Sequence, residues 1–72
     1  MTNTELLRKK IEASGLKLSY IASQLWISRA ALTMKIENKS DFRQKEIVKL
    51  CELLGITTAN EKTLIFLSEK LN

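Results

Sequence analysis

The side chains best suited to chemistry in this sequence bind rather than react, and they cluster at the start of a predicted helix over residues 28–36. A guanidinium such as that of Arg29 donates two parallel hydrogen bonds, which fits the O6 and N7 acceptors of a guanine base. Ser28 precedes it and can accept from the free backbone N–H groups at the start of the helix. The outward face of this helix is our candidate recognition surface. It carries Arg29, Ala30, Thr33 and Met34.

Side chains for catalysis are scarce. The 72 residues include no histidine and a single cysteine, which excludes imidazole catalysis, Ser-His and Cys-His nucleophiles, zinc-finger ligand sets and intramolecular disulfides. Neither Gly15 nor Gly55 lies in a phosphate-binding loop. Cys51 shares a helical face with Ile47 and Leu54, which predicts a buried small hydrophobe. The sequence therefore predicts a protein that is not an enzyme and uses no metal, cofactor or small-molecule substrate.

The recognition surface must be positioned by residues 18–37, which read as two short helices joined by a tight turn. Apolar residues recur in both at the i, i+3, i+4 spacing of half-buried helices. The small side chain of Ala22 lets the second helix cross the first at a steep angle, as in a helix-turn-helix. Ile27 is expected to plug the core beneath the turn. The residues predicted to face inward are Ile21, Ala22, Leu25, Leu32 and Ile36.

A helix is also predicted before this motif. It begins at Thr2, with Glu5 at the spacing of a capping box, and it runs to about Ser14. Gly15 then supplies the left-handed residue that commonly ends a helix.

Two more helices are predicted after the motif, so the fold class is all-α. One spans roughly residues 43–54 and ends at Gly55, with Phe42 anchoring the loop before it. The last begins at Thr57 or Thr58 and carries apolar residues around more than one face. Some of them should stay exposed unless the helix only closes the core or a partner covers them. These residues are Leu64, Ile65, Phe66, Leu67 and Leu71.

Charge is distributed unevenly within a formal net charge of +4. Residues 1–45 hold nine Lys or Arg against four acids, and residues 46–72 hold three against four. The excess on the first part suits a polyanionic partner, although a solubilising surface would have the same composition. A chain of this length predicts one domain over residues 1–72. It contains no apolar signal region and no membrane-spanning run, which predicts a soluble cytoplasmic protein.

The order of these elements, and the run SRAALTMKIENKSDFRQKEIVKLCELLGI in particular, resembles the Cro and lambda-repressor family of helix-turn-helix regulators. The likeness is greatest to small members from phages and prophages of Gram-positive bacteria. It covers nearly the whole chain and implies a five-helix lambda-repressor-like bundle containing a helix-turn-helix. The residues that carry the resemblance are Ala22, Ile27, Ser28, Arg29, Leu32, Lys35, Ile36, Lys39, Ser40, Phe42, Glu46, Ile47 and the Leu-Leu-Gly at 53–55.

The resemblance also implies roles for individual residues. In the family, the third helix enters the major groove of double-stranded operator DNA and the ends of the motif hold phosphates. By position, the base-reading residues would be Ser28, Arg29, Ala30, Thr33 and Met34. The phosphate contacts would be Lys17, Leu18, Lys35, Asn38 and Lys39.

Several positions depart from the family pattern, and all of them reduce the capacity to bind DNA. Apolar residues replace hydrogen-bond donors at Leu18, Ala30, Ala31 and Met34. Glu37 and Asn38 replace the usual Asn-Gly and bring a carboxylate near the expected phosphates, which opposes binding. Trp26 occupies a turn position that is normally glycine, at some cost in backbone strain. Its indole is either an interface residue or a partly buried flank of the core.

Two functions follow as hypotheses. The first is a Cro-like transcription regulator that binds operator DNA, as a homodimer, and counteracts a repressor in a phage lysogeny switch. The alternative is an antirepressor, similar to the modulator-of-repression proteins of some Gram-positive phages, with little DNA affinity of its own. It would bind a partner repressor through Trp26, Ala30, Ala31 and Met34, with Glu37 or Asp41 pairing the repressor's arginines.

Overall fold

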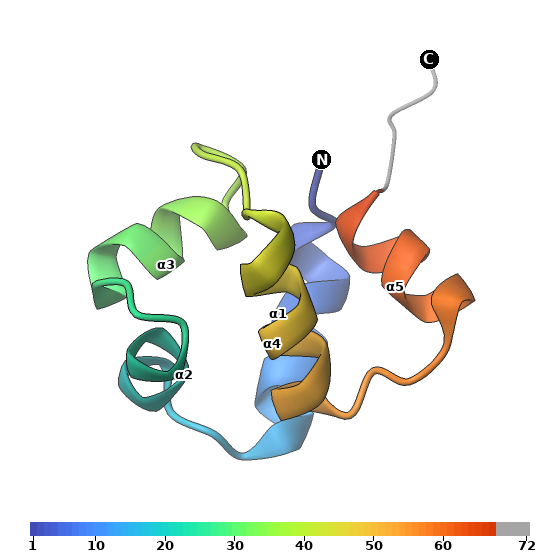
Figure 1. The fold of residues 1–72 in the computed structure, drawn as a ribbon, viewed down its shortest axis with the longest axis horizontal. Helices are drawn as coiled ribbons and strands as arrows, with labels where there is room; N and C mark the ends of the chain where they lie inside the picture. The colour runs from blue at the N-terminus through green and yellow to red at the C-terminus, as the bar shows by residue number, and fades with distance from the viewer. Residues whose placement is uncertain (68–72) are drawn as a thin grey trace.

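The computed structural model describes residues 1–67, which are all-helical and contain five helices and no strand. In Figure 1, α4 crosses the middle of the view in front of α1, with α2 and α3 on one side and α5 on the other. The helices are α1 (Thr4–Ser14), α2 (Leu18–Gln24), α3 (Arg29–Ile36), α4 (Gln44–Leu54) and α5 (Ala59–Phe66).

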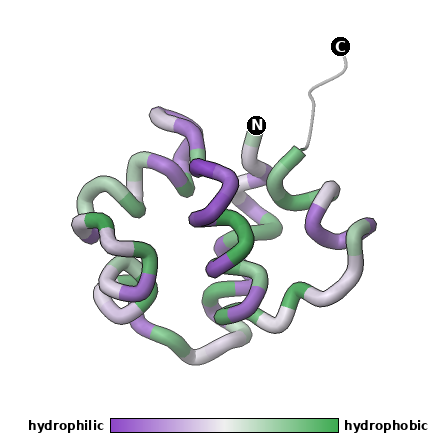
Figure 2. The backbone as a smooth tube through the Cα atoms, viewed as in Figure 1, coloured by the Kyte–Doolittle hydropathy of each residue, from purple (hydrophilic) through white to green (hydrophobic). Residues whose placement is uncertain are grey.

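The core is built around α1, which packs against α3, α4 and α5, while α2 packs against α3 and α4. Apolar and polar residues are interspersed along the helices (Figure 2), and every helix contributes at least two buried apolar residues to the core. All five inward-facing residues predicted for the motif are buried, and Ile27 packs against the same core. The most deeply buried large side chains are Leu7, Ile21, Leu32, Ile36, Leu50 and Ile65.

Most of the predicted helix ends are confirmed. The hydroxyls of Ser28 and Thr58 accept from backbone N–H groups at the starts of α3 and α5, and Gly15 and Gly55 adopt the left-handed conformation after α1 and α4. The predicted start at Thr2 is wrong. Asn3 is the N-cap of α1, and its side chain accepts from the N–H of Leu6.

The residues before α1 connect distant parts of the chain. Thr2 is buried, and its backbone N–H donates to Asn38 Oδ1 at 2.9 Å while its carbonyl accepts from Asn38 Nδ2 at 2.6 Å. The Thr4 hydroxyl donates to the carbonyl of Ile36 at 2.6 Å. On the other side, the Asn3 N–H donates to the carbonyl of Ile65 in α5 at 2.6 Å. This N-terminal segment therefore ties the end of α3 to α5.

The last helix has a buried and an exposed side, as its composition predicts. Ile65 and Phe66 are buried, and the Phe66 ring meets that of Phe42 edge-on with centroids 5.8 Å apart. Phe42 thus anchors its loop as expected. Leu64 and Leu67 are more than half exposed, whereas Leu71 lies outside the described residues. None of the helices within residues 1–67 has the length and apolar character to cross a membrane.

Candidate recognition surface around helix α3

The connection between α2 and α3 is a short hydrogen-bonded turn. The N–H of Trp26 donates to the Ser23 carbonyl at 3.2 Å, and the N–H of Ile27 donates to the Ala22 carbonyl at 3.1 Å. Ser28 Oγ then accepts from the Ala31 N–H at 3.0 Å, which starts α3. These bonds satisfy backbone groups that helix ends otherwise leave free, so the turn holds α3 in a defined position against α2.

The outward face of α3 matches the sequence prediction with one difference. Arg29, Ala30 and Met34 are exposed, whereas Thr33 is half-buried. No carboxylate of residues 1–67 lies within ion-pair distance of the Arg29 guanidinium. Its five N–H donors are therefore open to a ligand. The middle of the face, formed by Ala30 and Met34, is apolar.

Trp26 extends away from the body of the protein. Its φ angle is 61° and 93% of its surface is exposed, so the interpretation as a partly buried flank of the core is wrong. The left-handed conformation costs about 1 to 2 kcal/mol for a residue with a Cβ. Neither apolar burial nor backbone geometry accounts for a tryptophan at this turn.

Lys35 belongs to the scaffold rather than to the rim of the recognition surface. Its ammonium lies 2.6 Å from Glu46 Oε1, and the two side chains are 12% and 6% exposed. The same carboxylate oxygen accepts from the Arg43 backbone N–H at 2.8 Å and so caps α4. Because its ammonium is engaged with Glu46, Lys35 is not placed as the phosphate contact that the resemblance implied.

The ionisation of Glu46 reflects these contacts. Burial acts to raise the pKa of its carboxyl, but the hydrogen bonds from Lys35 and from the Arg43 N–H, together with their charges, lower it below its ordinary value. Glu46 therefore stays ionised and keeps Lys35 in place.

Asn38 also has a structural role in place of the implied phosphate contact. It adopts the left-handed conformation, with a φ of 64°, which asparagine tolerates better than most residues. Its side-chain amide is engaged with the backbone of Thr2 through both its oxygen and its nitrogen.

Glu37 is balanced by bases on both sides. Arg8 Nη2 lies 3.0 Å from Glu37 Oε2, and Lys39 Nζ lies 3.6 Å from Glu37 Oε1. The negative charge of Glu37, which the sequence places near the expected phosphates, is thus partly neutralised. The same contact engages Lys39, which is one of the expected phosphate contacts. Arg8 joins this surface from α1, a contact that sequence spacing could not reveal.

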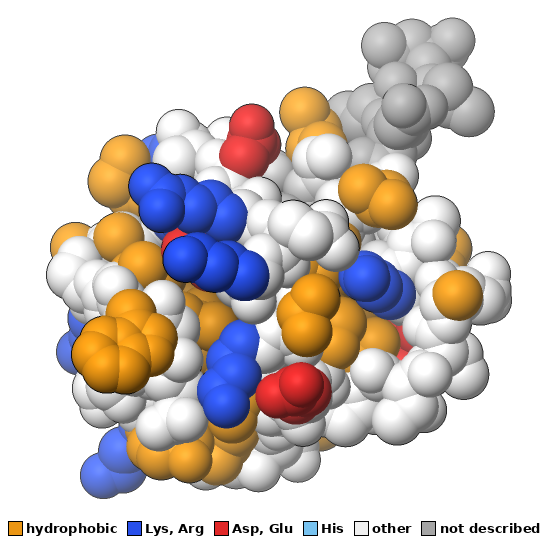
Figure 3. All heavy atoms as spheres, in the orientation of Figure 1, with side chains coloured by type: hydrophobic (Ala, Val, Ile, Leu, Met, Phe, Trp, Pro, Cys, Tyr) orange, Lys and Arg blue, Asp and Glu red, His pale blue; other side chains and the backbone are white. Residues whose placement is uncertain are grey.

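The remaining rim residues lie at the ends of the motif. Lys17 is the exposed N-cap residue of α2, and Lys39 is exposed after α3. Leu18 packs against the core and offers no polar group. Figure 3 shows Lys and Arg side chains grouped over the α3 and α4 part of the face in view.

Residues 1–67 contain no cluster of three His, Cys, Asp or Glu side chains that could hold a metal ion. Cys51 is half-buried, and burial raises the pKa of its thiol. The exposed groups of the surface around α3 are hydrogen-bond donors, charged groups and apolar side chains. No family model matches the chain, and the searches of curated proteins and of solved structures give no match either.

Proposed function

We propose that this protein is a Cro-like transcription regulator of a phage lysogeny switch, with α2 and α3 as the helix-turn-helix of a lambda-repressor-like bundle. In this proposal α3 reads operator DNA in the major groove, two copies bind successive half-sites, and the protein acts in the cytoplasm of a bacterial host, where it counteracts a repressor.

The observation that carries the proposal is the charge arrangement at the two ends of α3. Arg29 projects from the first turn with no carboxylate of residues 1–67 at ion-pair distance, while Glu37 at the other end is paired with Arg8 and Lys39. Phosphate contacts fix the position of a reading helix, and a bidentate arginine supplies base discrimination. Lys17 and Lys39 are the rim bases at the ends of the motif, and Arg8 adds a third from α1. Lys39 and Arg8 are exposed and share Glu37 as their partner, whereas the pair of Lys35 with Glu46 is buried.

Binding to DNA is tested by anisotropy of labelled duplexes from the region upstream of the gene, titrated from about 50 to about 200 mM salt. We expect sequence-selective binding that weakens steeply with salt. Arg29→Ala should reduce the difference in binding free energy between the preferred duplex and one with the wrong base by about 1 to 3 kcal/mol. Lys9→Ala, an exposed base on α1, serves as the control and should have a much smaller effect. Folded protein that binds every duplex equally, or none, would contradict the proposal.

A second candidate function rests on the apolar character of the same surface. Trp26, Ala30 and Met34 are exposed, and tryptophan is among the residues most enriched at interface hot spots. They support an antirepressor that covers the DNA-reading surface of a partner repressor.

One substitution separates the two functions. Glu37→Gln removes a negative charge and releases Arg8 and Lys39 from their ion pairs. A DNA-binding protein should gain affinity for its duplex, whereas an antirepressor that pairs Glu37 with a repressor's arginine should lose affinity for that repressor. Both affinities are measured on variant protein that circular dichroism shows to have the helix content of the wild type.

A further inference from the structure

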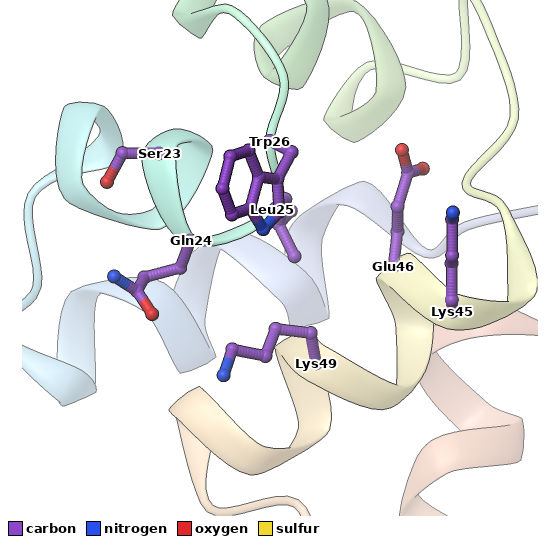
Figure 4. Close-up of a pocket in the computed structure, with 7 residues that line it drawn as sticks. All are labelled: Ser23, Gln24, Leu25, Trp26, Lys45, Glu46 and Lys49. Carbon is purple, nitrogen blue, oxygen red and sulfur yellow. The ribbon is translucent and has the colours of Figure 1, made fainter.

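A separate cleft opens between the turn after α2 and the exposed side of α4 (Figure 4). It has a volume of about 460 Å³, and Gln24, Leu25 and Trp26 line one wall while Lys45, Glu46 and Lys49 line the other. Arg29 is not part of its lining, so the cleft is distinct from the outward face of α3. The cleft is open to solvent, since its lining residue Trp26 is 93% exposed.

The cleft presents one large aromatic surface. The Trp26 indole, which is 93% exposed, borders the cleft from the turn after α2, and Lys49 borders it from α4. The fold makes little use of this indole, and its backbone is in the left-handed region, so the indole is free to contact an occupant of the cleft.

The charge of the cleft is positive. Lys45 forms no ion pair with residues 1–67. Lys49 has one weak ion pair, in which its Nζ lies 3.9 Å from Glu52 Oε1 on the same helix. The one acid in the lining, Glu46, points its carboxylate at Lys35 and the Arg43 N–H. An occupant would therefore meet two ammonium groups beside an aromatic face.

We propose that this cleft binds an acidic peptide segment of a partner protein, with an apolar or aromatic side chain against Trp26 and flanking carboxylates on Lys45 and Lys49. Such a segment uses both features of the site. A DNA duplex would use only the lysines, because its bases are stacked and present no free face to the indole. The proposal does not depend on the reading of DNA by α3, whereas the antirepressor alternative would also use Trp26.

The probe is a labelled peptide with one phenylalanine flanked on both sides by glutamates. Two control peptides carry alanine in place of the phenylalanine or lysines in place of the glutamates. Trp26 is the single tryptophan of the chain, so its emission should shift to shorter wavelength when the acidic peptide binds. Neither control peptide should produce this shift at the same concentration.

Three variants test the residues, with anisotropy of the labelled peptide as the readout. Trp26→Gly, which suits the left-handed backbone, should weaken binding about fivefold or more, as expected for a hot-spot residue. Lys45→Glu combined with Lys49→Glu should abolish it. Lys9→Glu and Arg29→Ala lie outside the cleft and should leave it unchanged. Circular dichroism confirms that each variant retains its helices.

The proposal is overturned if the peptide fails to bind, or if it binds the cleft variants and the wild type alike. It is also overturned if only a DNA duplex shifts the Trp26 emission and this shift is lost in the Lys45 and Lys49 variant, because the cleft would then belong to a nucleic-acid surface. Loss of duplex binding in Arg29→Ala with peptide binding intact would separate this site from the function of α3.

Discussion

Lys35 Nζ and Glu46 Oε1 are 2.6 Å apart, and this pair joins the last turn of α3 to the start of α4. The carboxylate also caps α4 through the Arg43 N–H, so one side chain fixes two elements. Removing one member of such a pair leaves the other charged and poorly hydrated.

Glu46→Gln should therefore lower the free energy of unfolding by about 1 to 3 kcal/mol. Urea denaturation followed by circular dichroism measures the change. Glu52→Gln is the matched control, because Glu52 is exposed and pairs only loosely with Lys49; its effect should stay below about 1 kcal/mol. Equal effects of the two substitutions would show that the buried pair contributes no more to the free energy of unfolding than the exposed pair.

Acid should destabilise the protein through the same carboxylate. The pKa of Glu46 is lower in the folded protein than its ordinary value of 4.5, so the folded state binds this proton less readily than the unfolded chain. The stabilisation is fully present above that ordinary value and is lost as pH falls through the lower folded pKa. Stability measured from neutral to acid pH should fall less steeply in Glu46→Gln than in the wild type. Parallel curves would contradict this assignment.

Asn38 can be tested with two substitutions that separate its two roles. Asn38→Ala loses the hydrogen bonds to Thr2 and also strains the left-handed backbone, and should cost about 2 to 4 kcal/mol. Asn38→Gly loses the hydrogen bonds but keeps the conformation, and should cost less. The melting temperatures of the two variants show which one is more stable. A glycine variant less stable than the alanine variant would show that backbone strain is unimportant here.

Trp26→Gly should leave stability unchanged or raise it by up to about 1 kcal/mol. Glycine relieves the strain of the positive φ but gives the unfolded chain more freedom, and the two effects partly cancel. Since the exposed indole makes little contact with the fold, no packing is lost. A decrease of more than about 1 kcal/mol in urea denaturation would mean that the indole packs against its neighbours more than its exposure indicates.

Local signals in the sequence predicted the secondary structure well. Ser28, Thr58 and the two glycines act on backbone groups within a few residues, so their effect is readable from spacing alone. Thr2 misled the prediction because Asn3, the next residue, competes for the same capping position. The apolar spacing of residues 18–37 predicted the buried side correctly for the same reason, since helical periodicity needs no knowledge of the partner helix.

The site was harder to predict because its polar residues have distant partners. The resemblance implied phosphate contacts at Lys35 and Asn38, yet Glu46 and Thr2 already engage these side chains. No spacing rule connects residues 36 positions apart. Arg8 near Glu37 was missed in the same way, whereas the exposed residues Arg29, Ala30 and Met34 were placed correctly because they depend only on the phase of one helix.

The hydrogen bond from the Asn3 N–H to the Ile65 carbonyl brings the start of the chain beside α5, as Figure 1 also shows. An arrangement in which the first residues lie beside the last described helix favours circular permutation. A short linker from Leu67, the C-cap residue of α5, back to residue 1, with new ends opened in the exposed loop at residues 39–41, should preserve all five helices. Lys35 and Glu46 would then stand near opposite ends of the permuted chain and still meet. Such a permutant would show that α3 and α4 are positioned by their contacts rather than by the loop that joins them.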